Sequence, residues 1–305
     1  MKELIRKPNS RARNIQHFLS KQDVNELSLN TYRRAINRFY NYIDSRGIEA
    51  QFVTFPHLRE YKQMLFDEQL SPYTISLYIT TVRKFYQCVE DETPNYRSPA
   101  RGLKGAKVNS RVYSRDALTK AQIKELFKEI DGHRRDRAMI LLMVYCGLRT
   151  IEVSRCDIGD IRNQGNKEVL YIQGKGRDSK DDFVVLNGSV LKALRSYLKS
   201  RKGKTPEQPL FVNQLKNGNI RRLRPASVSW ICKNYLKAIG IDDPRITAHS
   251  LRHSCATVAY DAKVPLEGIQ SLMRHSAITT TMKYVHMRKK TESGYELQIE
   301  NYLVA

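Results

Sequence analysis

Residues 272–284 read LMRHSAITTTMKY, and this stretch near the C-terminus decides how the rest of the chain is interpreted. It ends at Tyr284, one of 17 tyrosines, which taken alone would be expected to be a packed aromatic side chain. His275 lies nine residues before it. One imidazole ahead of one tyrosine is a weak signal, so its meaning depends on the basic groups that lie upstream.

A second imidazole group lies in residues 248–257, AHSLRHSCAT. The i, i+3 spacing of His249 and Arg252 places both side chains on one face of a helix. His249 and His253 have the i, i+4 spacing of two zinc ligands, but the glutamate of an HExxH motif is absent. Because Arg252 would place a positive charge between them, we predict no metal site here.

An arginine follows the most apolar helix of the chain. Residues 136–148, DRAMILLMVYCGL, are apolar on almost every face and predict a buried helix that ends near Gly147. Arg149 comes directly after it, in CGLRTIEV, and Glu152 is placed to pair with it. The guanidinium group is a planar fork of donors that matches two oxygens of a phosphate.

A lysine lies in the turn of a predicted β-hairpin. Residues 168–186, EVLYIQGKGRDSKDDFVVL, have apolar flanks around a glycine-rich polar turn, which predicts strand, turn and strand. Lys175 lies at the tip, from which it can reach a substrate, and Lys180 competes for any such role. The turn does not match a nucleotide-binding GxxxxGK[ST] loop.

The charge of the chain points to an acidic polymer as partner. The 305 residues carry 53 Lys and Arg against 31 Asp and Glu, a net charge of +22. Such a surplus is typical of proteins that bind nucleic acid. Membrane-surface binding and simple solubility are the alternatives, but the sequence shows no basic amphipathic helix or lipidation signal. We also find no spanning segment or signal peptide, which predicts a cytoplasmic protein that does not bind membranes.

The five cysteines are odd in number, far apart and never in a CxxC pair. This pattern argues against a zinc cluster and against a disulfide framework, so we expect reduced, buried thiols. They are Cys88, Cys146, Cys156, Cys232 and Cys255.

The first part of the chain predicts a small all-helical domain over residues 1–95. Residues 27–47 predict a helix with Ser28 as its N-cap, and residues 70–92 predict another, capped by Ser71. Further helical segments cover residues 14–22 and 55–69. Their apolar residues recur with the helical period, so each helix has a face to bury.

A basic, turn-rich linker is expected over residues 96–115. No acidic residue lies between Glu92 and Asp116. Because the linker joins two parts of a strongly basic chain, we expect it to lie along a phosphate backbone. The residues predicted to contact DNA are Arg97, Arg101, Lys104, Lys107 and Arg111.

Residues 116–305 predict a second domain with mixed secondary structure. Helical patterns, one of them capped by Thr119, surround the predicted hairpin. The chain ends in a short amphipathic tail with no obvious partner face of its own. The predicted fold class is therefore mainly α with a small antiparallel β-sheet.

The order and spacing of these groups resemble those of the tyrosine recombinases, which include the phage-type integrases and the Xer-type recombinases. The most specific stretches are CGLRTIEV, AHSLRHSCAT and LMRHSAITTTMKY. The resemblance covers most of the chain and implies an N-terminal SAM-like core-binding domain before an α+β catalytic domain. One departure is Arg274, at a position where the family often has glycine.

The resemblance implies a reaction for these residues. Tyr284 would attack a DNA phosphodiester, leaving a 3′-phosphotyrosyl link and a free 5′-hydroxyl. A tyrosine hydroxyl is a weak nucleophile with a pKa near 10, so the charge that develops on the phosphate must be stabilised. Arg149 and Arg252 would clamp the phosphate oxygens. His275 would add a hydrogen bond to the phosphate. Lys175 would protonate the leaving oxygen.

The same resemblance assigns His249 as the group that takes the tyrosine proton. Neither a metal nor another cofactor is expected, because the cations stabilise the phosphate and the covalent link conserves the bond energy. The implied partners are double-stranded DNA recombination sites and further copies of the chain in a tetrameric synapse.

Three alternatives stay open. A type IB topoisomerase shares this chemistry, but the separate helical domain and the tail after Tyr284 favour a recombinase. A catalytically inactive DNA-binding protein would not need the full set of residues. A metal-dependent nuclease could use the acidic pairs Asp181–Asp182 or Asp242–Asp243, although such pairs are common in turns. The tail either packs on its own domain or docks on a neighbouring protomer.

Overall fold

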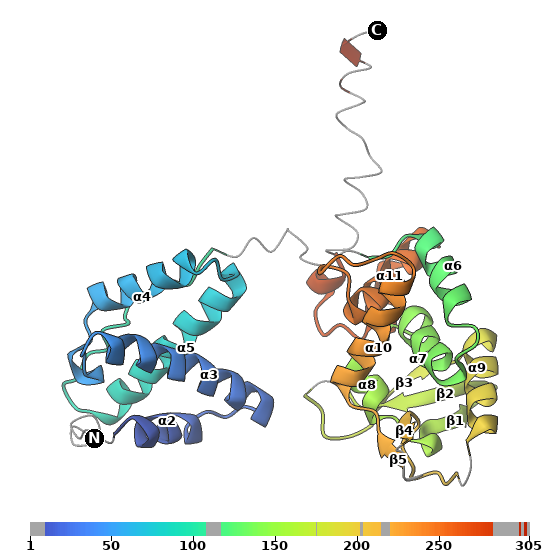
Figure 1. Cartoon of the computed structure of the whole chain (residues 1–305), viewed down its shortest axis with the longest axis horizontal. Helices are drawn as coiled ribbons and strands as arrows, with labels where there is room; N and C mark the ends of the chain where they lie inside the picture. The colour runs from blue at the N-terminus through green and yellow to red at the C-terminus, as the bar shows by residue number, and fades with distance from the viewer. Residues whose placement is uncertain are drawn as a thin grey trace. The chain divides into compact units, whose positions relative to one another are not determined.

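The structure is a computed structural model that describes residues 10–107, 117–174, 176–201, 204–214, 220–282, 299 and 302–303. The chain divides into two compact units, residues 1–110 and 111–305. Figure 1 shows helices alone in the first unit, and helices with two small sheets in the second. Within the described residues, no helix is both long and apolar enough to cross a membrane.

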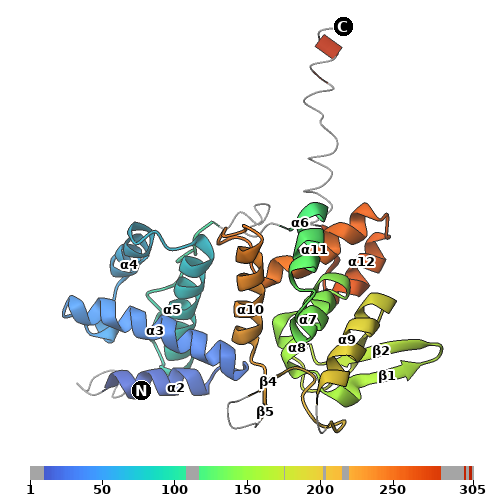
Figure 2. The same ribbon diagram turned by 45° about the vertical axis from the view of Figure 1, so that its right-hand side comes forward.

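The described residues of the first unit form four helices and a short 3-10 turn. They are α2 (Ser10–Ser20), α3 (Glu26–Ser45), η1 (Ala50–Phe52), α4 (Phe55–Asp67) and α5 (Pro72–Glu92). In Figures 1 and 2, α3 and α5 lie side by side. In the core of this unit, the ring of Phe39 on α3 contacts those of Tyr61 and Tyr86. The ring centroids are 5.2 Å apart for Tyr61 and 6.0 Å apart for Tyr86.

One of the two predicted caps in this unit is correct and the other is wrong. Ser71 accepts a hydrogen bond from the backbone N–H of Thr74 and caps α5, as expected. The cap of α3 is Asn25, because its side chain accepts the N–H of Ser28 at 3.0 Å. Ser28 therefore lies inside the first turn of the helix and does not precede it.

Part of the segment that the sequence assigns to the linker packs on the first unit. Ala100 and Leu103 are buried in its hydrophobic core. Lys62 donates to the carbonyl groups of Lys104 and Gly105, and Ser76 donates to that of residue 106. The linker's remaining residues from 108 on lie outside the described part of the chain, so the domain boundaries stay a prediction.

The second unit surrounds one buried helix. Its helices are α6 (Lys120–Glu129), α7 (Arg134–Tyr145), α8 (Thr150–Arg155), η2 (Ile158–Asp160), α9 (Gly188–Ser200), α10 (Pro225–Ala238), α11 (Ala248–Asp261) and α12 (Leu266–Met273). Figure 2 shows α7 among α8, α9 and α11. The apolar run that predicted a buried helix is confirmed, since α7 is buried from Ala138 to Val144.

The strands of this unit form two antiparallel sheets. They are β1 (Ile161–Gln164), β2 (Lys167–Ile172), β3 (Asp182–Val185), β4 (Val212–Gln214) and β5 (Ile220–Arg222). β2 pairs with β1 and with β3, and β4 pairs with β5. The predicted hairpin is β2 and β3, with Leu170 opposite Val184. The predicted fold class is confirmed, and β1, β4 and β5 are additions that the sequence analysis did not predict.

The cysteines lie mostly in the cores. All five are in described segments and all are free thiols. Four are buried as expected, while Cys88 is only partly buried. Burial raises the pKa of the Cys146 thiol to about 12, which keeps it protonated and unreactive at neutral pH.

Candidate active site

The turn between α7 and α8 presents the first predicted site residue. Gly147 has φ +60°, a left-handed conformation that favours glycine. A Cβ at this position would lie 3.0 Å from Met273 Sδ and 3.4 Å from Cys255 Sγ. The turn therefore packs tightly against α11 and α12. Arg149, two residues later, is the N-cap of α8 and starts close to both helices.

Glu152 is the acidic centre of the site. Its side chain is fully buried. Oε2 accepts the backbone N–H of Arg149 at 2.8 Å, and Oε1 accepts its Nη1 at 2.6 Å. The predicted pairing of Arg149 with Glu152 is thus confirmed. Because both the backbone and the side chain of Arg149 are held, its guanidinium group has a defined direction.

Arg252 comes to the same place from α11. Its side chain is 2% exposed, and its Nη1 lies 3.9 Å from Glu152 Oε2. Nη1 donates to the carbonyl oxygen of Gly147, and Nη2 donates to that of Met273. Each of these nitrogens carries two N–H groups, so one bond to a carbonyl does not prevent a second bond to a phosphate oxygen.

Arg274 is a third arginine at this carboxylate, and the sequence analysis gave it no role. It follows α12 with φ 50° and ψ 50°, the left-handed region. This backbone geometry explains why glycine suits the position, and it is formed here with an arginine. The Nη2 of Arg274 donates to Glu152 Oε2 at 2.9 Å. The signal in the sequence was the arginine itself, because its long cationic side chain can reach a carboxylate that glycine could not.

The three arginines keep Glu152 ionised inside the protein. Burial alone would raise the pKa of this carboxyl group, but the positive charge of Arg274 opposes it most strongly. The backbone hydrogen bond and the charge of Arg149 add to this, as does Arg252, and the pKa is lowered overall. A buried carboxylate with such partners can fix several cations in one arrangement.

The two predicted site histidines lie beside these cations. His275 is half-buried directly after Arg274, and its Nδ1 lies 2.9 Å from Thr281 Oγ1. Burial lowers the pKa of the His275 imidazole to about 4. The positive groups that lower it further are Arg252, Arg149, Arg274 and His249. The structure therefore brings together four of the predicted site residues, Arg149, His249, Arg252 and His275. With its lowered pKa, His275 is neutral at pH 7.

His249 lies one turn before Arg252 on α11 and is half-buried. Its ring meets that of His253 edge to face, with ring centroids 4.5 Å apart. His253 is buried, whereas His249 is partly exposed to solvent. This arrangement suits a proton acceptor at His249 better than at His253.

The lowered pKa of His275 predicts how stability depends on pH. Below its ordinary pKa of 6.5, the unfolded chain binds a proton at this residue that the folded chain does not bind. His275 therefore makes the folded state less stable as the pH falls from about 6.5 towards about 4. We expect the melting temperature of wild type, relative to that of His275→Asn, to decrease between pH 7 and pH 5. A difference that stays constant with pH would contradict this.

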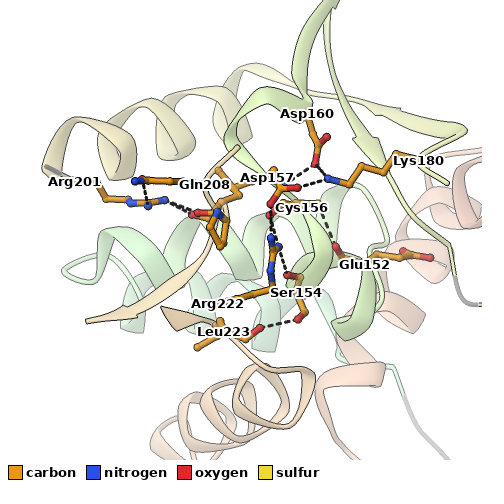
Figure 3. A network of polar contacts seen from close by, with 12 residues as sticks. Glu152, Ser154, Cys156, Asp157, Asp160, Lys180, Arg201, Gln208, Arg222 and Leu223 are labelled. Atoms are coloured by element: carbon orange, nitrogen blue, oxygen red, sulfur yellow. Dashed lines mark hydrogen bonds and ion pairs between the residues drawn. The ribbon is translucent and has the colours of Figure 1, made fainter. Parts of the chain in front are cut away.

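The predicted lysine positions have different outcomes. Lys175 lies outside the described residues. Its competitor Lys180 is described, and its Nζ lies 2.6 Å from both Asp157 Oδ2 and Asp160 Oδ2 (Figure 3). Partial burial lowers the pKa of the Lys180 amine, but its hydrogen bonds to the two carboxylates outweigh this and raise it. Lys180 is therefore held as a structural cation and is a poor proton donor.

The contacts of Lys180 belong to a wider network that fixes the base of the hairpin. Arg222 of β5 donates to Asp157 Oδ1 at 2.5 Å and to the carbonyl oxygens of Ser154 and Cys156 (Figure 3). The end of α8, the start of β3 and the second sheet are thereby joined. Since Arg149 is the N-cap of α8, the network ties the hairpin to the helix that Arg149 precedes.

The remaining predicted residues are divided between described and undescribed segments. Tyr284 and Arg111 lie outside the described residues. The other four residues predicted to contact DNA are all exposed on the first unit, and they are Arg97, Arg101, Lys104 and Lys107. Arg101 pairs with Glu90 at 3.0 Å while its side chain stays 71% exposed. These groups are accessible to a polyanion.

Among the described residues, one group has the composition of a metal site, and it belongs to the first unit. The ligand atoms of His17, Cys88 and Glu92 lie within 4.8 Å of one another in the first unit. Glu92 is already paired with His17 at 2.8 Å and with Lys21 at 3.1 Å. Both oxygens of Glu92 are therefore already engaged by protein groups.

Two family models and several known proteins match this chain. Residues 116–291 match the family model of the phage integrase family. Residues 15–93 match the model of the phage integrase N-terminal SAM-like domain. A tyrosine recombinase of Pseudothermotoga lettingae is 28% identical over 254 residues, which cover 83% of this chain and 84% of the relative.

A second relative is the tyrosine recombinase XerC of Caldanaerobacter subterraneus. It is 30% identical over 217 residues, covering 68% of this chain and 58% of the relative. Among solved structures, XerH bound to a palindromic difH substrate in a post-cleavage complex superposes with a TM-score of 0.73. That match covers 94% of this chain and 85% of the other at 20% identity, so it shows a shared fold.

Proposed function

The chain belongs to the phage integrase family and is a site-specific tyrosine recombinase, and we propose that Tyr284 is its nucleophile. The enzyme cleaves and rejoins DNA through a 3′-phosphotyrosyl intermediate. The observation that carries the residue assignment is that Arg149 and Arg252 meet at one buried carboxylate, Glu152, and that the charges of both arginines act on His275. Tyr284 lies nine residues after His275 in the chain.

The proposed roles follow from the charges in the site. Arg149 and Arg252 stabilise the negative charge that develops on the two non-bridging oxygens of the phosphate. His275 is neutral at pH 7, so its N–H donates a hydrogen bond to the same phosphate without adding charge. His249 accepts the proton of the tyrosine hydroxyl as the bond to phosphorus forms.

Lys175 is the proposed general acid that protonates the leaving 5′-oxygen. Support comes from its competitor, because Lys180 is held by two aspartates and its pKa is raised. A lysine on the hairpin between β2 and β3 would reach the DNA from a base that the Lys180 network keeps in place. Protonation of the leaving oxygen by a lysine requires no metal ion.

The type IB topoisomerase reading is not favoured. The match of residues 15–93 to the integrase SAM-like domain and the recombinase relatives both support strand exchange. A cytoplasmic location is proposed on the same ground, because the relatives act in DNA recombination. Integration, excision and resolution use one active site, and the chemistry described here serves all three.

We propose that the exposed basic residues 97–107 contact the phosphate backbone of the recombination site. Replacing Arg101, Lys104 and Lys107 together by glutamine should weaken DNA binding. Each phosphate contact contributes about 0.9 to the slope of log K against log salt. The magnitude of the slope should therefore fall by up to about 2.7, measured by fluorescence anisotropy between 50 and 200 mM salt.

The control for this experiment removes the same charge elsewhere. Lys192, Arg195 and Lys199 are exposed on α9, and their triple glutamine variant has the same net charge as the first variant. We expect it to change the salt slope less. An unchanged slope in the Arg101, Lys104 and Lys107 variant, or equal changes in both, would show that this segment does not touch DNA.

We propose further that the C-terminal tail joins protomers in a tetrameric synapse on DNA. Ile299, Tyr302 and Leu303 are 59%, 85% and 75% exposed on the single chain. Exposed apolar groups of this kind are typical of an interaction segment. Packing on the same protomer is the alternative. A head-to-tail arrangement closes into a ring and couples each active site to its neighbour.

Truncation after Lys290 separates these two possibilities. We expect the shortened protein to bind a half-site as a monomer but to form no synaptic complex on native gels. Its melting temperature without DNA should stay close to that of wild type. Normal synapsis would contradict docking between protomers, and a lowered melting temperature would instead support packing on the same protomer.

A further inference from the structure

Arg274 occupies a backbone position that is unfavourable for any residue with a Cβ. Its φ of 50° lies in the left-handed region, where glycine meets no steric penalty. The backbone N–H of Arg274 donates to the carbonyl oxygen of Ser271 at 2.9 Å, which ends α12. Contacts of the arginine side chain that glycine cannot make would offset this cost.

The side chain of Arg274 makes such contacts on two separate segments. Nη1 donates to the carbonyl oxygens of Cys146 at 3.1 Å and Leu272 at 2.7 Å. Nη2 donates to the carbonyl oxygen of Gly147 and to Glu152 Oε2, both at 2.9 Å. The guanidinium group therefore joins the turn that precedes Arg149 to the helix end that precedes His275.

The guanidinium group is directed into the protein. Its side chain is 8% exposed, and within the described structure its buried Nε has no hydrogen-bond partner. Nη1 and Nη2 carry two N–H groups each, and the four contacts above use all of them within the protein, so these nitrogens have no donor left for a phosphate. Arg252 donates to the same Gly147 carbonyl, so two arginines bridge the same turn and the same helix end. Arg274 also lies nearer to Glu152 than Arg252 does, at 2.9 against 3.9 Å.

From these contacts we propose that Arg274 is a positioning residue for strand cleavage. It fixes Glu152 and the Gly147 turn, and through them it sets the directions of Arg149 and Arg252 before DNA binds. It also holds the end of α12, which sets the place of the next residue, His275. The inference rests on the proposed function of these residues at the phosphate. Donors that are fixed in advance need no rearrangement as the phosphate charge develops.

The test compares Arg274→Gly with wild type on a nicked duplex that carries the recombination site. The rate of covalent adduct formation is measured in single turnover with the protein in excess, and half-site affinity is measured separately. We expect the cleavage rate to fall about 10- to 100-fold, the effect of a misplacement of about 1 Å. Affinity should change less than about threefold, because the Nη donors of Arg274 are used within the protein.

The matched control is Lys263→Gly. Lys263 is an exposed residue with φ 62°, so this variant makes the same backbone change at the end of α11 without removing a buried cation. We expect its cleavage rate to equal that of wild type. Arg274→Lys keeps the charge but lacks the fork of donors, so it should restore part of the rate.

The possible outcomes distinguish the role of Arg274 from the proposed function. A wild-type cleavage rate in Arg274→Gly, while wild type forms its adduct normally, would overturn the role of Arg274 and leave the proposed function intact. If Arg274→Gly is unfolded at the assay temperature, Arg274→Lys decides, since a rate equal to wild type would overturn the role. Failure of wild type itself to form an adduct would instead contradict the proposed function.

Discussion

Tyr284→Phe is expected to abolish the covalent protein–DNA adduct while half-site binding is retained. The substitution removes one hydroxyl group and keeps the aromatic ring, so it changes the nucleophile alone. Loss of the nucleophile in a covalent hydrolase costs about 10⁶-fold in rate, and no measurable adduct should remain. The measurement is a denaturing gel of the protein after incubation with a nicked duplex that traps the cleaved strand.

The matched control is Tyr260→Phe, because Tyr260 is the nearest tyrosine upstream of the active-site segment. It is half-buried and packs against the small hydrophobic cluster that includes Ile269 and Met273. We expect this variant to form the adduct at a rate close to that of wild type. An adduct that persists in Tyr284→Phe and disappears in Tyr260→Phe would move the nucleophile to Tyr260.

Glu152→Gln is expected to damage both stability and cleavage. The amide keeps the shape of the side chain but leaves the three arginines around it without a negative charge. Breaking a buried ion pair by removing one partner costs about 3–5 kcal/mol. For a domain of this size the melting temperature should fall by about 10 °C. The cleavage rate should fall about 100-fold or more, since the phosphate donors lose their fixed directions.

Glu125→Gln is the control for this variant. Glu125 is exposed on α6, so the same chemical change removes a charge that no buried group depends on. Surface substitutions of this kind change stability by about 0.5 kcal/mol or less. If Glu152→Gln melts and cleaves as Glu125→Gln does, the buried carboxylate is not the centre that holds the arginines.

Much of the fold was predictable because a helix can be recognised from the period of its apolar residues and from its capping residue. The apolar positions of α3 predicted its buried face, and Ser71 and Thr119 cap α5 and α6 as their sequences indicate. The apolar run of α7 predicted the central helix of the second unit. These signals depend on neighbours within a few residues, which a single sequence contains.

The strands β1, β4 and β5 could not be predicted in the same way. β1 reads Ile-Arg-Asn-Gln, with one partly buried position and three exposed ones, so it has no alternating apolar face. β4 and β5 are three residues each. Such strands form because a partner strand is brought beside them, as β2 is for β1. Their pairing depends on tertiary structure that the local sequence does not contain.

The sequence named Arg149, His249, Arg252 and His275, which the structure brings together, but it did not indicate most of the contacts that hold them. The sequence placed Arg149 beside Glu152 because they are three residues apart. It did not place Arg274 there, since the contact joins residues 122 positions apart. The choice between Lys175 and Lys180 also needed the structure, because the aspartates that hold Lys180 lie 20 and 23 positions before it.

Mass-spectrometric mapping of the trapped adduct tests the central claim most directly. The wild-type protein is incubated with a nicked duplex that carries its recombination site, and the covalent complex is digested with protease and nuclease. We predict a nucleotide joined to the Tyr284 oxygen through its 3′-phosphate, and a free 5′-hydroxyl on the released strand. A nucleotide on any other residue, or a link to the 5′ end, would contradict the account.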